Sequence, residues 1–151
     1  MQRAFEITMT IRKELSVFLQ NYSLEQLNKV PDGFSNNLIW NIGHIVVVQQ
    51  MLVYALSGLP MMVSPEMIAK FRKGTRPEGN VSQEEIDEIQ SLLFTTIELT
   101  KTDLENGIFK EYREFTNMYG YTLKSAEDAI AFNYSHEMMH LGMMLMIRKF
   151  I

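Results

Sequence analysis

Two histidines near the end of the chain have the spacing of a metal-binding pair. The segment His136-Glu137-Met138-Met139-His140 holds both of them, four residues apart. On a helix, this spacing places both imidazoles on one face about one turn apart, within reach of a single ion. The segment also matches the HExxH pattern, in which two histidines hold zinc and the glutamate acts as general base. Because the pattern is short, the third ligand decides what it means.

The position of the third ligand argues against a protease. Zincin metalloproteases take it from beyond the second histidine, but Leu141 to Ile151 contains no His, Asp or Glu. We therefore expect that the protein is not a zincin protease and that a third ligand comes from upstream. The one remaining histidine, His44, lies in a segment without charged residues. A buried imidazole without a partner is unfavourable, and a metal ion would satisfy it.

A non-metal interpretation competes with this one, because a lone histidine in an apolar helix is usually hydrogen-bonded within the core. Two observations favour a shared site. Gly43 and Gly142 are small residues beside the histidines, so they would let the two backbones approach each other. Both segments are also unusually apolar around their histidines. The sequence therefore favours a three-histidine metal site of His44, His136 and His140, with core histidines and no metal as the alternative.

Four stretches of the chain predict the long helices that would position these residues. The first has an apolar stripe at helical spacing, and Arg12, Lys13 and Glu14 are predicted mostly on its opposite, polar side. The third starts at a capping box formed by Ser82 and Glu85. The predicted helices cover about residues 4–22, 37–57, 82–106 and 125–151, with short helices after Ser23 and at 64–71.

These elements predict an all-α protein with a single domain over residues 1–151. Four substantial helices in one chain of this length imply a four-helix bundle. The connections are too long for a series of tight hairpins, so we expect a long crossover between the second and third helices. Residues 108–124 alternate weakly and contain Gly120, which makes them a candidate for extended structure.

The composition narrows the class of protein. Fourteen Lys and Arg against 18 Asp and Glu give a net charge of −4, which argues against nucleic acid and anionic membranes as partners. The first twenty residues contain no apolar signal-peptide region, so a cytoplasmic location is expected. The stretch Leu38–Leu59 is long enough to cross a bilayer, but polar residues interrupt it. We therefore expect a helix buried in a bundle or a subunit interface, and no membrane span.

Three motifs together resemble the DinB-like (DinB/YfiT) superfamily of metalloenzymes. The motifs are NLIWNIGH at 37–44, YGYTLKSAEDA at 119–129 and HEMMHLG at 136–142. The resemblance implies an up-down-down-up four-helix bundle, often a homodimer. It also implies a divalent metal, commonly nickel or zinc, held by His44, His136 and His140. Some members are thiol-dependent transferases or isomerases that use bacillithiol, mycothiol or glutathione. The sequence departs from the family at Met143, where a glutamine is frequent.

The chemistry of such a site follows from its ligands. Three neutral imidazoles leave coordination positions open, as in catalytic rather than structural metal sites. A metal ion there could lower the pKa of a bound water or thiol. Because the chain has no cysteine, a thiol would have to arrive as a cosubstrate. Glu137 is a candidate base or partner of a ligand, with an interhelix salt bridge as the alternative. Asn41 shares the face of His44 and is a candidate orienting hydrogen-bond partner.

The leading hypothesis is therefore a cytoplasmic, metal-dependent, thiol-using S-transferase that acts on a small molecule. The alternative is a non-catalytic metal-binding or stress-associated interaction module on the same bundle. A bundle with core histidines and no metal comes third.

Overall fold

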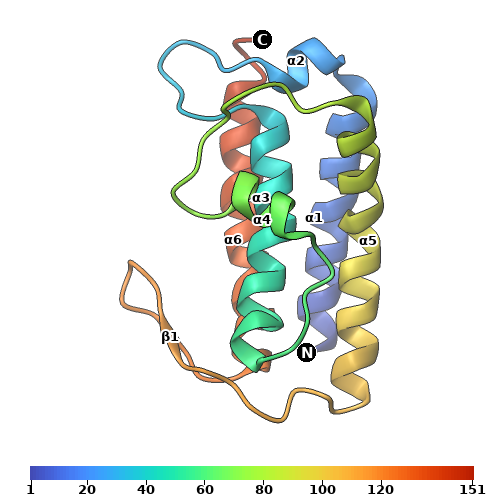
Figure 1. Cartoon of the computed structure of the whole chain (residues 1–151), viewed down its shortest axis with the longest axis vertical. Helices are drawn as coiled ribbons and strands as arrows, with labels where there is room; N and C mark the ends of the chain where they lie inside the picture. The colour runs from blue at the N-terminus through green and yellow to red at the C-terminus, as the bar shows by residue number, and fades with distance from the viewer.

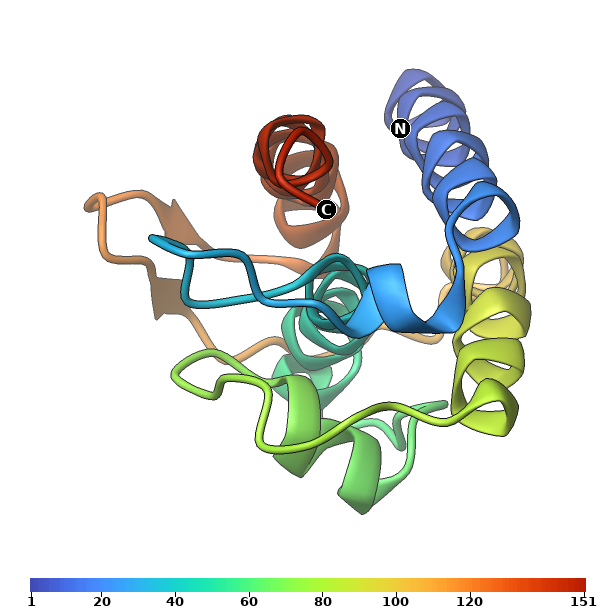
Figure 2. The same cartoon turned by 90° about the horizontal axis from the view of Figure 1, so that it is seen from above.

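The computed structural model describes residues 1–151 and is mostly helical, which confirms the predicted all-α class (Figure 1). Four long helices, α1, α3, α5 and α6, lie side by side, and Figure 2 shows them nearly end-on. The elements are α1 (Gln2–Asn21), α2 (Leu24–Asn28), α3 (Leu38–Val53), the 3₁₀ helix η1 (Ala55–Ser57), α4 (Pro65–Phe71), α5 (Gln83–Glu105), β1 (Phe115–Thr116), β2 (Thr122–Leu123) and α6 (Ala126–Ile147).

Side-chain caps start the helices where the sequence predicts them. The Ser82 hydroxyl accepts the backbone N–H of Glu85, and the Glu85 carboxylate accepts that of Ser82, which confirms the capping box of α5. Asn37 Oδ1 accepts the backbone N–H of Trp40 at the start of α3. Ser125 caps α6 in the same way. Each cap satisfies a backbone donor that has no partner within its helix.

The helix ends differ more from the prediction. α3 ends at Val53, and the chain tightens into η1 before Gly58, whose φ of 70° ends the helical path.

The stretch 108–124, a candidate for extended structure, contains only four strand residues. They form an antiparallel hairpin in which Phe115 pairs with Leu123. The remaining residues of that stretch form turns and irregular backbone.

The connection from α3 to α5 carries η1 and α4, and α4 packs directly on α3 (Figure 1). α3 itself is the most enclosed of the long helices. The stretch Leu38–Ser57 is long and apolar enough to cross a membrane by length and composition, but 83% of its most apolar window is buried inside the protein. Its apolar character is therefore explained by packing against the surrounding helices.

Candidate metal centre

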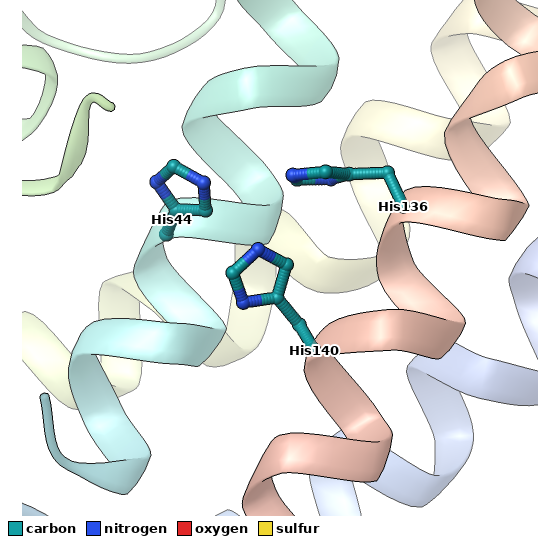
Figure 3. Close-up of side chains that lie close together, drawn as sticks. All are labelled: His44, His136 and His140. Atoms are coloured by element: carbon teal, nitrogen blue, oxygen red, sulfur yellow. The ribbon is translucent and has the colours of Figure 1, made fainter. Parts of the chain in front are cut away.

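The three histidines of the chain converge between α3 and α6. His44 projects from α3, and His136 and His140 project from adjacent turns of α6, so that the rings face one another (Figure 3). Each ring offers a nitrogen, and these nitrogens lie within 4.8 Å of one another. The ring centroids are 4.6 to 5.4 Å apart. The predicted trio therefore forms a cluster that could hold a metal ion.

Hydrogen bonds set the tautomers of two of the rings. His44 Nδ1 lies 2.6 Å from the carbonyl oxygen of Phe71, and His140 Nδ1 lies 2.8 Å from Asn41 Oδ1. The Asn41 amide is oriented because its Nδ2 donates to the carbonyl of Asn37. Because both partners are acceptors, each Nδ1 carries the proton and donates it. Nε2 of His44 and of His140 is then the nitrogen with a free lone pair, as in histidines that bind metals.

His136 differs from the other two rings. Its Nδ1 is buried and has no hydrogen-bond partner. A buried polar atom without a partner costs about 1–3 kcal/mol. A cation held at this nitrogen would remove that cost. The histidine cluster therefore fits a metal ion in its donor set, and it also contains a fully buried ring nitrogen, His136 Nδ1, that has no partner within the protein.

Burial keeps the three rings uncharged at neutral pH. The pKa of His136 is lowered to about 4. Removal from water is the main cause, and the neighbouring His44 and Arg12 contribute to the same shift. The pKa of His140 falls to about 3, again mainly through burial. Burial also lowers the pKa of His44, against the opposing effect of its hydrogen bond to Phe71. Neutral imidazole is the form that binds a metal, so no proton has to leave first.

Trp40 covers one face of His44, and a loop residue holds Trp40 in place. The Trp40 ring stacks on His44 with centroids 4.6 Å apart and planes 15° from parallel. Its indole Nε1 donates to Thr75 Oγ1 in the loop after α4. Trp40 is itself buried. The Phe71 carbonyl is a partner that sequence reasoning misses, because a backbone acceptor leaves no signal in residue types.

The close packing of α4 against α3 depends on Gly43. An alanine Cβ at this position would lie 2.7–2.8 Å from the Phe71 ring. Gly142 has nothing within 4 Å of the corresponding position. The expectation that both glycines let α3 and α6 approach each other is therefore wrong. Gly43 instead admits α4, whose Phe71 carbonyl binds His44, and Gly142 lies exposed on α6.

These two glycines provide a matched pair of variants. Gly43→Ala is expected to destabilise the fold by about 1–3 kcal/mol, because the crowded Phe71 ring must move. Gly142→Ala is expected to stabilise it by up to about 1 kcal/mol, because alanine favours helix and meets no obstacle. Urea unfolding followed by circular dichroism measures both. Equal stabilities of the two variants would contradict the close contact at Gly43.

Glu137 lies on the face of α6 that turns toward α1. Its carboxylate accepts from Arg12 Nη2 at 2.7 Å and from Arg12 Nε at 2.9–3.0 Å, and Asn133 Nδ2 also donates to it at 2.7 Å. Arg12 Nη1 donates to the carbonyl of Leu93 on α5. Both charged side chains have 0% exposure. Of the two interpretations that the sequence allows for Glu137, these contacts fit the interhelix ion pair.

The placement of Arg12 corrects the sequence-based prediction. Helical periodicity puts Arg12 mostly on the polar side of the first helix, but the structure buries it completely. The reason is the opposite charge of Glu137, which a single-helix pattern does not include. A signal was available in α6, where Glu137 is a lone charge in a long apolar stretch and needs a buried partner.

The comparisons with known proteins identify the family of the chain. No curated protein matches the chain significantly. A family model does match, and its description is the DinB superfamily. The match extends over residues 8–144, which include the three histidines, Asn41 and the Arg12–Glu137 pair. Because the family model matches most of its length, the chain belongs to the DinB superfamily.

Proposed function

We propose that the protein binds one divalent transition metal ion through His44, His136 and His140 and uses it as a metalloenzyme. The observation that carries the proposal is the convergence of three neutral imidazoles, two of them with Nδ1 engaged and Nε2 free. Membership of the DinB superfamily supports it. We infer likewise that the four long helices form the family's up-down-down-up bundle, since α1 and α6 run one way and α3 and α5 the other (Figure 1).

The donor set favours particular metals. Imidazole nitrogens suit zinc, nickel, copper and iron, whereas magnesium and calcium prefer oxygen ligands. Nickel or zinc is our proposal. Such an ion, when bound, supplies Lewis acidity that lowers the pKa of a coordinated water or thiol. The chain itself holds the ligands: Phe71 and Asn41 orient two rings, and Trp40 covers the face of His44.

We propose an S-transferase reaction as the activity, with a low-molecular-weight thiol such as bacillithiol or glutathione as cosubstrate. The absence of cysteine supports an external thiol, because the chain has no nucleophilic sulfur of its own. The second substrate would be a small electrophile, and the reaction would take place in the cytoplasm. The alternative is a metal-binding module without catalysis. The enzyme and the non-catalytic module would use the same three ligands, so only a reaction with a thiol distinguishes the two proposals.

Protein purified without a histidine tag and freed of metal tests the first step. Titration with Zn²⁺ or Ni²⁺ is expected to reach one ion per chain, measured by elemental analysis after gel filtration. Uptake below about 0.1 ion per chain for both metals would end the metal proposal.

The thiol proposal has a separate test. The optical spectrum of the Co²⁺-loaded protein is expected to change when bacillithiol or glutathione is added, because a thiolate that replaces water alters the ligand field of the ion. An unchanged spectrum, together with no conjugation of a model electrophile by either thiol, would refute the transferase and leave the metal-binding module.

A further inference from the structure

Three basic side chains lie close together in the chain, on the turn that follows α4. They are Arg72, Lys73 and Arg76, and all three are exposed. We call residues 72–76 the basic turn. None of the three forms an ion pair, whereas the nearby Lys70 pairs with Glu85 on α5. Unpaired basic side chains that share one turn attract anions and bind them through charge-assisted hydrogen bonds.

Hydrogen bonds hold the basic turn in one shape. The Thr75 hydroxyl donates to the carbonyl of Arg72 at 2.8 Å, and the Thr75 backbone N–H donates to the same oxygen at 3.2 Å. Gly74 has a φ of 89°, which lets the chain reverse between these two residues. A turn that is already ordered loses less conformational entropy on ligand binding than a flexible loop does. The three basic residues are therefore presented by a preformed backbone.

The basic turn is attached to the candidate metal centre at two points. Phe71, the residue just before it, accepts a hydrogen bond from His44 Nδ1 at 2.6 Å through its carbonyl. Within the turn, Thr75 Oγ1 accepts from the indole N–H of Trp40 at 3.1 Å, and the Trp40 ring stacks on His44. Burial is the main cause of the lowered pKa of His44, and the charge of Lys73 acts in the same direction. The positive charge of the turn therefore lies beside a ring that would bind the metal.

The opposite side of the bundle shows how basic residues are balanced elsewhere in this protein. Figures 1 and 2 place the loop after α4 beside α3, on the side away from α1 and α5. A groove between α1 and α5 is lined by Lys13 and Lys101, but Glu6 and Glu98 line it as well. Basic and acidic side chains are equal in number there. The basic turn has no acidic partner of this kind, so an external anion is the natural counter-charge.

We propose that the basic turn binds an anionic group, a carboxylate or a phosphate, of the small molecule that reacts at the metal centre. Arg72 and Arg76 supply planar guanidinium groups, which match either anion with paired hydrogen bonds, and Lys73 supplies a compact point charge. The identity of the bound molecule as the reactant rests on the proposed function, but the anion site itself needs neither metal nor thiol. A macromolecular polyanion does not fit, because the net charge of the whole chain is −4.

The inference narrows the class of thiol in the proposed reaction. Glutathione and bacillithiol both carry carboxylates in addition to their thiol. Such a molecule would place its sulfur at the metal and a carboxylate at the basic turn, whereas an uncharged thiol would bind the metal alone. We therefore expect the metal-loaded protein to bind anionic thiols more tightly than uncharged thiols of similar size.

Metal-free protein tests the anion site by itself. Malate and inorganic phosphate are titrated at low ionic strength, with malamide, the uncharged diamide of malate, as the control ligand. Calorimetry measures the affinity, and the fluorescence of Trp40, the sole tryptophan, reports binding beside Thr75. At least one of the two anions is expected to bind with a dissociation constant of about 1 mM or tighter and to change the Trp40 emission. Malamide is expected to do neither.

A matched pair of double variants locates the site. Lys73→Gln with Arg76→Gln is expected to weaken anion binding at least about 10-fold, because two charge-assisted hydrogen bonds are lost. Lys13→Gln with Lys101→Gln changes the net charge by the same amount on the other side of the bundle. This control is expected to keep the affinity within about twofold, because solvent and salt screen distant surface charges. All four side chains are exposed, so both double variants are expected to keep their helicity.

Co²⁺-loaded protein tests the link between the anion site and the reaction. Mercaptosuccinate is expected to bind at least about 10-fold more tightly than the uncharged 1-thioglycerol, measured by the change in the optical spectrum of the ion. The double variant Lys73→Gln with Arg76→Gln is expected to remove this difference, because it lowers the affinity for the anionic thiol alone.

Three results would overturn the inference. They are no binding of either anion to the metal-free protein at concentrations up to about 50 mM, equal anion binding by the two double variants, and equal affinities for the two thiols. Failure of the proposed function would give a different result. The metal-free protein would still bind malate or phosphate, but metal uptake or the response of the Co²⁺ spectrum to every thiol would be absent.

Discussion

Replacing His140 with alanine is expected to abolish stoichiometric metal binding while the helices stay folded. The cluster would fall from three nitrogen ligands to two, and Asn41 Oδ1 would lose the N–H that it accepts. Loss of a residue that only orients a ligand typically costs 10–100-fold in metal affinity, so loss of a ligand is expected to cost more than about 100-fold. Competition with a chromophoric chelator measures the affinity, and circular dichroism measures the fold.

The neighbouring Met139 provides the control, because its side chain is 43% exposed and lies on the outward side of the same turn. Met139→Ala is expected to bind metal as the unmodified protein does. His44→Ala and His136→Ala are expected to lose affinity to a similar extent as His140→Ala, since each removes one of three ligands. Unchanged metal content in His140→Ala would show that the ligands lie elsewhere.

The second large effect concerns the buried ion pair of Arg12 and Glu137. Arg12→Met or Glu137→Gln alone is expected to reduce the free energy of unfolding by about 3–5 kcal/mol, because each leaves one fully buried charge without its partner. The double variant Arg12→Met with Glu137→Leu removes both charges. It is expected to be at least as stable as the unmodified protein to within about 1 kcal/mol, since apolar replacements of a buried pair are often neutral or stabilising.

Urea unfolding measures these differences, and the pair Lys101–Glu105 on α5 is the control. Both of its side chains are more than half exposed and their charged atoms are 4.0 Å apart, so Lys101→Met is expected to change stability by less than about 1 kcal/mol. Metal uptake by the double variant distinguishes the two candidate roles of Glu137, which are a partner of the metal site and an interhelix ion pair. Retained uptake and stability fit a structural ion pair. If the double variant lost as much stability as Glu137→Gln alone, the Arg12 and Glu137 charges would not be energetically coupled, and this prediction would be wrong.

Much of this protein is determined locally, and the sequence suffices for it. Ser82 with Glu85, Ser125 and Asn37 start helices because capping involves residues only two or three positions apart. The spacing of His136 and His140 is likewise a property of one helix. The burial of α3 follows from its own lack of charge. These features depend on short-range geometry, so residue order alone predicts them.

The partners of the site residues depend on how the helices meet. Asn41 shares the face of His44 along α3, yet its side chain binds His140 across the interface with α6. The Phe71 carbonyl reaches His44 only because Gly43 leaves room for α4. Arg12 enters the core because Glu137, 125 residues later, neutralises it there. Each of these contacts joins residues that are distant in the chain. The periodicity of one helix shows which of its faces is buried, but it does not show which side chains of another helix pack against that face.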